Sequence, residues 1–181
     1  DFHSSLRRLA RRLTLEPNSS GEVFQEAGKI KKDAERNSAT EGLKSLQLWL
    51  SDKDVYFYDV REYVYKSPSD IFSVFLTPAF GAVFNRNRYC IHVWNTKIPA
   101  LTARIAQAGL ALFSDHFSIH ETPSVLCLRT RTLHTLVRTS EQLMLGNIFA
   151  LSIEKLYRDC EVTEIPPRQP PEPIPPRYPA E

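Results

Sequence analysis

The chain has 181 residues, of which 42% are hydrophobic and 24% are charged, and 23 basic against 21 acidic side chains leave a net charge of +2. This size and composition are typical of a soluble globular protein with one core, and the near balance of charges argues against a specific nucleic-acid binder. No apolar run reaches the roughly eighteen residues that a membrane-spanning helix needs, so no transmembrane segment is expected.

The cysteine and motif content narrows the chemistry further. The three cysteines are too few and too far apart for a zinc site or a disulfide framework, and they fit a reducing compartment best: Cys90, Cys127 and Cys160. Glycine-rich phosphate loops, GxSxG, HExxH and paired CxxC motifs do not occur in the sequence, so neither a metal nor a resident cofactor is predicted. The first residues, DFHSS, do not resemble a secretory signal.

Helical periodicity dominates the first fifty residues. Residues 4–14 predict a basic amphipathic helix, because leucines recur at helical spacing among four arginines: Leu6, Leu9 and Leu13. We interpret this stripe as docking on the core, with a membrane-surface or targeting role as the alternative. Residues 22–36 predict a mostly solvated helix, and residues 42–50 predict another helix that ends at the SDKD turn.

An aromatic stretch follows, DVYFYDVREYVYKSPSDIFSVFL, whose residue types favour strands. It divides into three expected strands, with turn formers before the third: residues 55–60, 62–66 and 71–76. Both faces of the third strand are largely apolar, which predicts a central strand of the sheet. We assign most of these aromatic side chains to the sheet core and expect only Tyr63 and Tyr65 to face a cleft.

The next elements are marked by capping and turn signals. Thr77 and Pro78 predict a helix start, because a capping hydroxyl precedes a proline at the first helical position. Three apolar side chains follow at helical spacing: Phe80, Val83 and Phe84. Residues 88–95 predict a strand.

A further helix is expected over residues 99–110, capped by Asn95 or Thr96 and stopped at Gly109. The remaining segments predict strands over residues 111–119, 124–131, 132–139, 141–145 and 147–157. Helices thus come mostly first and strands mostly last. The sequence therefore predicts an α+β fold, in which N-terminal helices pack on a mostly antiparallel sheet.

Three regions are predicted along the chain. Residues 1–20 form a basic amphipathic helix and loop, residues 21–160 a single α+β domain, and residues 161–181 a proline-rich tail. The tail is expected to be disordered, in extended polyproline II conformations. Near its end Pro175, Pro176 and Tyr178 complete a PPxY motif. We favour a solvated spacer here, with binding to a WW-domain protein as the alternative.

Paired carboxylates in an aromatic setting suggest glycoside hydrolysis, which needs two carboxyl groups, one of them held protonated by an apolar surround. Asp59 and Glu62 are the first candidate pair, and Asp115 with Glu121 is the second. We favour the alternative that DVRE forms an exposed turn, in which Arg61 neutralises its acidic neighbours.

Two other pairs of residues have the spacing of a functional motif, but the expected strands argue against both. His116 and His120 are four residues apart, but in an expected strand such residues lie about 13 Å apart, too far to share a metal. Arg129 and His134 have the Arg-x4-His spacing of some helical ribonucleases. Their flanks prefer strand, so we interpret this match as accidental.

Taken in order, three segments resemble the core of the RolB/RolC family, the plast proteins carried on the transferred DNA of plant-infecting agrobacteria. They are KDVYFYDVREYVYKSPSDIFSVFL, TKIPALTARIAQAGL and PSVLCLRTRTLHTLVRTSEQLMLGNIFALS. The similarity spans roughly residues 41–155 and is a pattern of hydrophobic strands. Elements typical of the family correspond here to residues 54–58 and 71–76, Ile98 with Pro99, and residues 146–150.

The resemblance implies a protein that acts inside a transformed plant cell, in the cytoplasm, the nucleus or both, and alters growth, morphology and hormone response. Family members are described as β-glucosidases acting on hormone glucosides, and one branch as sharing an ADP-ribosyltransferase-like fold. Thr96 matches a threonine implicated in that branch. Phe75, however, stands where that branch has a tyrosine, and a phenyl ring cannot donate a proton or hydrogen bond as a phenol can.

Three functions therefore remain open. A regulatory module would bind host plant proteins, and substitutions at Asp59, Glu62 and Thr96 would not change a growth response. A β-glucosidase would release hormone from a glucoside and lose activity when Glu62 or Asp115 becomes an amide. An ADP-ribosyltransferase would bind NAD and modify a host protein. Because no strong catalytic motif is present, we favour the module.

Overall fold

The computed structural model describes residues 3–16 and 18–160. Its helices are α1 (Ser4–Leu15), α2 (Ser20–Gly28), α3 (Asp33–Leu50), α4 (Ala103–Ala111) and α5 (Ser140–Asp159), with a short 3-10 helix η1 (Ser114–His116). Its strands are β1 (Tyr56–Tyr58), β2 (Tyr63–Lys66), β3 (Ser73–Leu76), β4 (Phe80–Phe84), β5 (Asn87–Trp94), β6 (Glu121–Cys127) and β7 (Thr132–Thr135). The predicted α+β fold is confirmed. The proline-rich tail with Pro175, Pro176 and Tyr178 lies outside the described residues.

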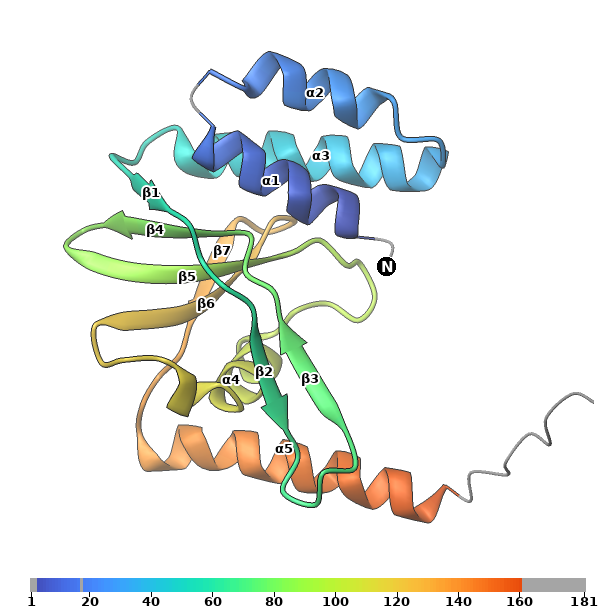
Figure 1. Cartoon of the computed structure of the whole chain (residues 1–181), viewed down its shortest axis with the longest axis vertical. Coiled ribbons are helices and arrows are strands. Elements are labelled where there is room, and N and C mark those ends of the chain that lie inside the picture. The colour runs from blue at the N-terminus through green and yellow to red at the C-terminus, as the bar shows by residue number, and fades with distance from the viewer. Residues whose placement is uncertain (1–2, 17, 161–181) are drawn as a thin grey trace, which may run out of the picture.

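The strands form a five-stranded sheet in the order β1-β4-β5-β6-β7 and a separate pair, β2-β3. Strands β5 and β6 run parallel, and the other pairs are antiparallel, so the predicted antiparallel bias is confirmed. Helices α1, α2 and α3 cover one face of the larger sheet, while α4 and α5 lie on its other side (Figure 1). None of the helices among the described residues is both long and apolar enough to cross a membrane.

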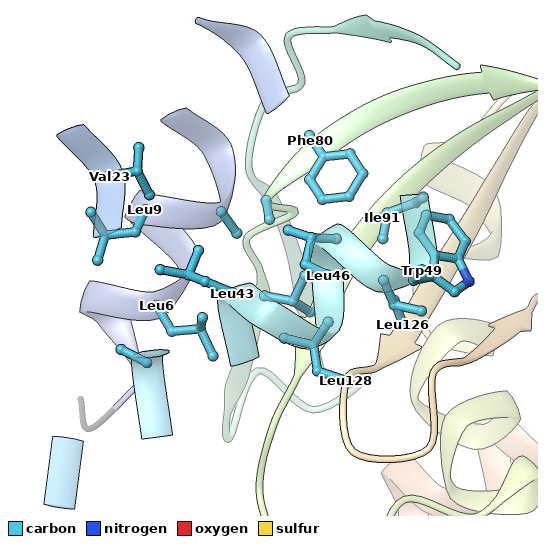
Figure 2. Close-up of a cluster of buried hydrophobic side chains, with 14 of the residues drawn as sticks. Leu6, Leu9, Val23, Leu43, Leu46, Trp49, Phe80, Ile91, Leu126 and Leu128 are labelled. Atoms are coloured by element: carbon cyan, nitrogen blue, oxygen red, sulfur yellow. The ribbon is translucent and has the colours of Figure 1, made fainter. Parts of the chain in front are cut away.

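The main core lies between the three N-terminal helices and the sheet, where side chains from α1, α2 and α3 meet those of β4, β5 and β6 (Figure 2). The leucine stripe of α1 is part of it: Leu6 and Leu9 are 2% and 0% exposed, and Leu13 packs against the cluster. The docking interpretation is therefore confirmed. Each fully buried leucine contributes about 1.5–3 kcal/mol relative to an exposed one.

Three arginines of α1 form ion pairs with nearby carboxylates. Arg8 and Arg12 both pair with Glu26 of α2, and Arg12 also pairs with Glu16 at 3.0 Å. Arg11 pairs with Asp59, just beyond β1. These pairs attach the polar side of α1 to adjacent segments of the chain.

A second cluster of buried residues lies on the other side of the sheet, between the β2-β3 pair and the segment that follows α4. The Tyr63 ring lies tilted against Phe117 at a ring-centroid distance of 4.3 Å, and Tyr65 approaches Phe113 at 6.3 Å. Tyr63 is only 7% exposed. The prediction that Tyr63 faces a cleft is wrong, because its ring fills the space between the strand pair and η1.

The strands predicted over residues 141–145 and 147–157 are wrong, because this segment forms the single helix α5. It begins after Thr139, whose side chain accepts a hydrogen bond from the Gln142 amide at 3.3 Å. The residues that α5 buries are unusual for a helix, namely Gly146, Ala150 and Glu154. Since two of them are small and one is charged, the buried side has no apolar periodicity to reveal the helix.

Two further predictions are wrong, one about the type of an element and one about the place of a strand in the sheet. Residues 80–84 form β4 and not a helix, because Phe80 pairs with Ile91 in the sheet while Val83 pairs with Arg88. The segment 71–76 is not central: β3 belongs to the two-stranded sheet, and Phe75 is 62% exposed. Its two apolar faces therefore do not reflect burial on both sides.

Helix boundaries account for the other differences. The helix predicted over residues 22–36 is divided into α2 and α3 by the lysine-rich segment 29–32. Helix α4 begins at Ala103, because the Thr102 side chain accepts from the Ile105 amide at 3.2 Å and thereby caps it. The strand predicted over residues 111–119 is instead the end of α4 followed by η1.

Candidate functional site

The parallel strands β5 and β6 end side by side, since Trp94 pairs with Cys127 and the two chains then leave the sheet. Strand β5 continues into Asn95, Thr96 and Lys97, and β6 continues into the turn that contains Arg129. In sheets with parallel strands, ligands commonly bind beyond the carboxyl ends of those strands. This edge of the sheet is therefore a candidate binding region.

Two hollows lie at this edge and share Asn95 and Arg129. One, of about 400 Å³, is lined by His3, Ser38, Asn95, Thr96, Lys97, Ile98 and Arg129. The other, of about 330 Å³, is lined by Glu41, Lys44, Ser45, Asn95 and Arg129. We call these two adjoining hollows the Asn95 groove. Its wall on one side is α3, and on the other side are the segments that follow β5 and β6.

Asn95 is held rigidly at the base of this groove. It is 8% exposed, and its amide nitrogen donates to the backbone oxygen of Ser38 at 2.9 Å and to the Ser38 hydroxyl at 3.0 Å. The absence of a side chain at Gly42 permits this approach, because a Cβ there would lie 3.2 Å from the Asn95 amide nitrogen and 2.9 Å from Leu6. The sequence of α3 thus fixes the position of a buried polar side chain.

Thr96 and His3 meet at the groove wall, where the threonine hydroxyl lies 3.2 Å from Nε2 of the imidazole. Burial lowers the pKa of His3, and the positive charge of Arg7 lowers it further, while Glu35 raises it. A lowered pKa keeps the imidazole neutral near pH 7, so it can either donate to the hydroxyl or accept from it. The pair offers polar contacts beside the basic side chains.

The charges around the Asn95 groove are mostly positive. Lys44, Lys97 and Arg129 are exposed and line it, against one acidic side chain, Glu41. A guanidinium presents several N–H donors in a plane that matches a carboxylate or a phosphate. The groove is therefore suited in chemistry to an anionic group.

The predicted carboxylates Asp59 and Glu62 lie elsewhere, in the connection between β1 and β2. The Asp59 side chain is 68% exposed, pairs with Arg11 and accepts from the Val60 amide at 2.8 Å. Glu62 is exposed and accepts from the Thr77 hydroxyl at 2.7 Å. Both carboxylates therefore lie at the surface with polar partners.

Asp115 and Glu121 are also engaged by local partners. Asp115, on η1, accepts from the Ser114 hydroxyl at 3.2 Å. Glu121, at the start of β6, accepts from the Tyr58 hydroxyl at 2.9 Å. Burial, followed by this hydrogen bond, raises the pKa of Tyr58. Of the four predicted catalytic residues, Thr96 alone lines the Asn95 groove, while Asp59, Glu62 and Asp115 do not.

A larger hollow of about 680 Å³ lies between α4, β7 and the start of α5. Its charged lining is mixed, with one basic and one acidic side chain, Arg104 and Glu141. The amide of Gln107 is occupied by two 3.0 Å hydrogen bonds to the backbone of Val137. His134 lines this hollow from β7. Arg129 lines the Asn95 groove instead, so the two side chains of the Arg-x4-His spacing face different hollows.

Within residues 3–16 and 18–160, no group of three or more His, Cys, Asp or Glu side chains is placed to hold a metal ion. Cys90 and Cys127 are buried and unpaired with each other, and burial raises the pKa of the Cys90 thiol. A raised pKa keeps this thiol protonated and unreactive. Cysteine chemistry therefore has no support at Cys90.

Sequence reasoning missed Asn95, Lys97 and Arg129 as members of one site. A signal for them was present, because a strand, a helix and a strand follow one another over residues 87–127. Such a connection commonly joins parallel strands, whose carboxyl ends lie at the same edge of the sheet. Polar residues directly after both strands would then be expected to meet.

In comparisons with protein-family models, with curated proteins and with solved structures, this chain has no match. Inferences about its function therefore rest on its residues and on their arrangement.

Proposed function

We propose that this protein is a binding module that modulates growth, morphology and hormone response inside a transformed plant cell by binding host factors, and that its ligand site is the Asn95 groove. The observation that carries the proposal is the groove itself, where a buried Asn95 lies beside three cationic side chains: Lys44, Lys97 and Arg129. The cellular setting, in the cytoplasm or nucleus, is supported by the resemblance to RolB/RolC proteins.

The ligand class follows from the charges of the groove. Three cations against Glu41 favour a carboxylate or phosphate group, because each charge-assisted hydrogen bond contributes about 1.5–3 kcal/mol. Asn95 is fixed by Ser38, so little ordering of its side chain opposes binding. The ligand is therefore an anionic host metabolite or an acidic segment of a host protein. In the alternative that the tail binds a WW-domain protein, Pro175, Pro176 and Tyr178 would add a second, independent docking point.

A binding and turnover screen tests this function. Purified protein is titrated with NAD, ADP-ribose, the carboxylate auxin indole-3-acetate, and auxin and cytokinin glucosides, and product formation is followed in parallel. We expect saturable binding of at least one anionic probe, no turnover, and weaker binding in Lys97→Gln. Binding of neutral glucosides alone, unaffected by Lys97→Gln, would contradict the proposal.

An ADP-ribosyltransferase is the second candidate, favoured by the hydroxyl of Thr96 and the imidazole of His3 in the same groove. NAD carries a pyrophosphate, which suits the cationic lining. Lys31→Gln, at an exposed position between α2 and α3, is the control. Release of nicotinamide by wild-type protein that is lost in Thr96→Val and retained in Lys31→Gln would establish the transferase in place of the module. Since host factors can activate such enzymes, the assay is run with and without plant-cell extract.

A β-glucosidase ranks third, because Asp59 pairs with Arg11, and Glu62 and Asp115 are hydrogen-bonded to hydroxyl groups. We expect Asp59→Asn, Glu62→Gln and Asp115→Asn to leave binding in the Asn95 groove unchanged. Hormone release from a glucoside that disappears in any of these three variants would return the glycosidase to first place.

A further inference from the structure

Helix α5 carries a broad apolar face that the rest of the described chain leaves uncovered. Its large apolar side chains are between 41% and 62% exposed: Met144 (58%), Ile148 (52%), Phe149 (41%), Leu151 (57%) and Leu156 (62%). Figure 1 shows α5 along the outer side of the molecule, below α4. A contiguous apolar patch on a helix is a feature of interaction surfaces, since scattered single residues are the norm elsewhere.

The opposite side of α5 explains why the large residues face outward. Gly146 packs so closely on α4 that a Cβ there would lie 2.8 Å from the Cβ of Ala111 and 2.9 Å from its carbonyl carbon. Glu154 is 3% exposed and accepts from the Ser69 amide at 2.8 Å and from its hydroxyl at 3.0 Å. The inward side is therefore fixed by close backbone contact and specific hydrogen bonds. Rotating α5 to bury its apolar face would break both.

The charges on the outer face are arranged symmetrically. Glu141 precedes Ile148 by seven residues and Lys155 follows it by seven, and both charged side chains are exposed. Seven residues are about two helical turns, so all three lie on the same side of α5. An antiparallel copy of the helix centred on Ile148 would set each glutamate against a lysine. A parallel copy would set like charges against each other.

We propose that two copies of this chain associate through the outer face of α5, packed antiparallel about a two-fold axis near Ile148, with Glu141 of each copy opposite Lys155 of the other. Such an interface is isologous, so one patch serves both copies, as in most homodimers. The apolar side chains Met144, Ile148 and Leu151 supply the buried centre, and the ion pairs at the two ends set the orientation.

Sedimentation equilibrium of the full chain tests this dimer. We expect a concentration-dependent dimer for wild type, and Ile148→Asp, at a position already exposed in the monomer, should shift it to monomer with at least a tenfold rise in dimer Kd. Circular dichroism establishes that the variant stays folded. A wild-type chain that remains monomeric up to about 100 µM, a concentration far above a micromolar Kd, would overturn the proposal. The outer face of α5 would then be covered by another partner, such as the chain's own tail or a host helix.

A charge swap tests the antiparallel orientation. Glu141→Lys and Lys155→Glu should each weaken the dimer roughly tenfold, because each creates two like-charge contacts, and the double variant should restore it. Lys31→Glu, exposed between α2 and α3, is the control and should leave the dimer Kd unchanged. A double variant no tighter than the single variants would overturn the antiparallel arrangement.

Discussion

The large apolar side chains of α1 are buried, whereas those of α5 are exposed, although both helices pack beside the sheet. Helix α1 turns Leu6 and Leu9 inward to the main core and pairs its arginines with nearby carboxylates. Helix α5 turns small residues and Glu154 inward and leaves its large apolar residues exposed. The contrast indicates that α1 serves the stability of the fold, while the outer face of α5 is free to serve association.

The largest expected effect is on the free energy of unfolding, which a truncation in α1 should lower far more than a truncation on the outer face of α5. Leu9→Ala should lower the free energy of unfolding by about 2–5 kcal/mol, because Leu9 is 0% exposed and its removal leaves a cavity in the main core. Leu156→Ala, at a position 62% exposed on α5, should change it by no more than about 0.5 kcal/mol in dilute, monomeric protein. Urea unfolding measures both. Equal losses would contradict the assignment of different roles to the two helices.

The next largest effect on stability is expected at the close contact between α4 and α5. Gly146→Ala should destabilise the protein by about 1–3 kcal/mol, because the new Cβ meets the side chain and backbone of Ala111 at under 3 Å.

Gly109→Ala is the matched control on α4. Nothing lies within 4 Å of a Cβ at that position, and the substitution should stabilise the helix by about 0.4–1 kcal/mol. A stabilising Gly146→Ala, seen by thermal unfolding, would show that the two helices are not held in close contact.

A smaller effect concerns pH and His92 in β5, whose Nδ1 lies 2.8 Å from the Thr77 carbonyl oxygen. Burial lowers the pKa of His92 to about 4, so the folded state holds the imidazole neutral. The unfolded chain takes up its proton near pH 6.5, and stability should therefore fall as the pH falls from about 6.5 to about 4. The free energy of unfolding should fall by on the order of 1–3 kcal/mol. This range is lower than the full pKa shift would give, because the His92 side chain is only half-buried.

The control for this pH effect is His92→Asn, which keeps a donor for Thr77 and cannot titrate. Urea unfolding from pH 4 to pH 7 should give a shallower slope for the variant than for wild type. Identical slopes would show that His92 is not held neutral, and that the acid sensitivity comes from carboxylates common to both proteins.

The sequence predicts α1 and β5 well, because their buried apolar residues recur with the spacing of a helix and of a strand, respectively. Leu6 and Leu9 recur at helical spacing and are buried, and Ile91 and Val93 alternate along a strand and join the main core. Helix α5 could not be predicted in this way, since its buried stripe contains glycine, alanine and glutamate. Strand β4 was masked by a helix-start signal at Thr77 and Pro78, which the pairing with β5 overrides.

The candidate site was predicted only in part. The resemblance to a known family indicates Thr96, while the sequence alone indicates Asn95 only as a helix cap and Arg129 only as part of an accidental spacing. Their proximity depends on the parallel pairing of β5 and β6, and the strand predicted over residues 111–119 obscures the strand-helix-strand order that indicates this pairing. The Asp59 and Glu62 prediction relied on nearby aromatic residues. The structure shows that Arg11, far away in the sequence, is the partner of Asp59.

Titration calorimetry of an anionic probe against two arginine variants from one turn tests the proposed function most directly. Arg129→Gln removes a cation that lines the Asn95 groove, and Arg131→Gln removes an equal charge that does not. With the tightest anionic probe from the screen, we expect Arg129→Gln to raise the Kd at least roughly tenfold and Arg131→Gln to leave it close to that of wild type. Equal weakening by both variants, or by neither, would contradict a specific anion site in the groove.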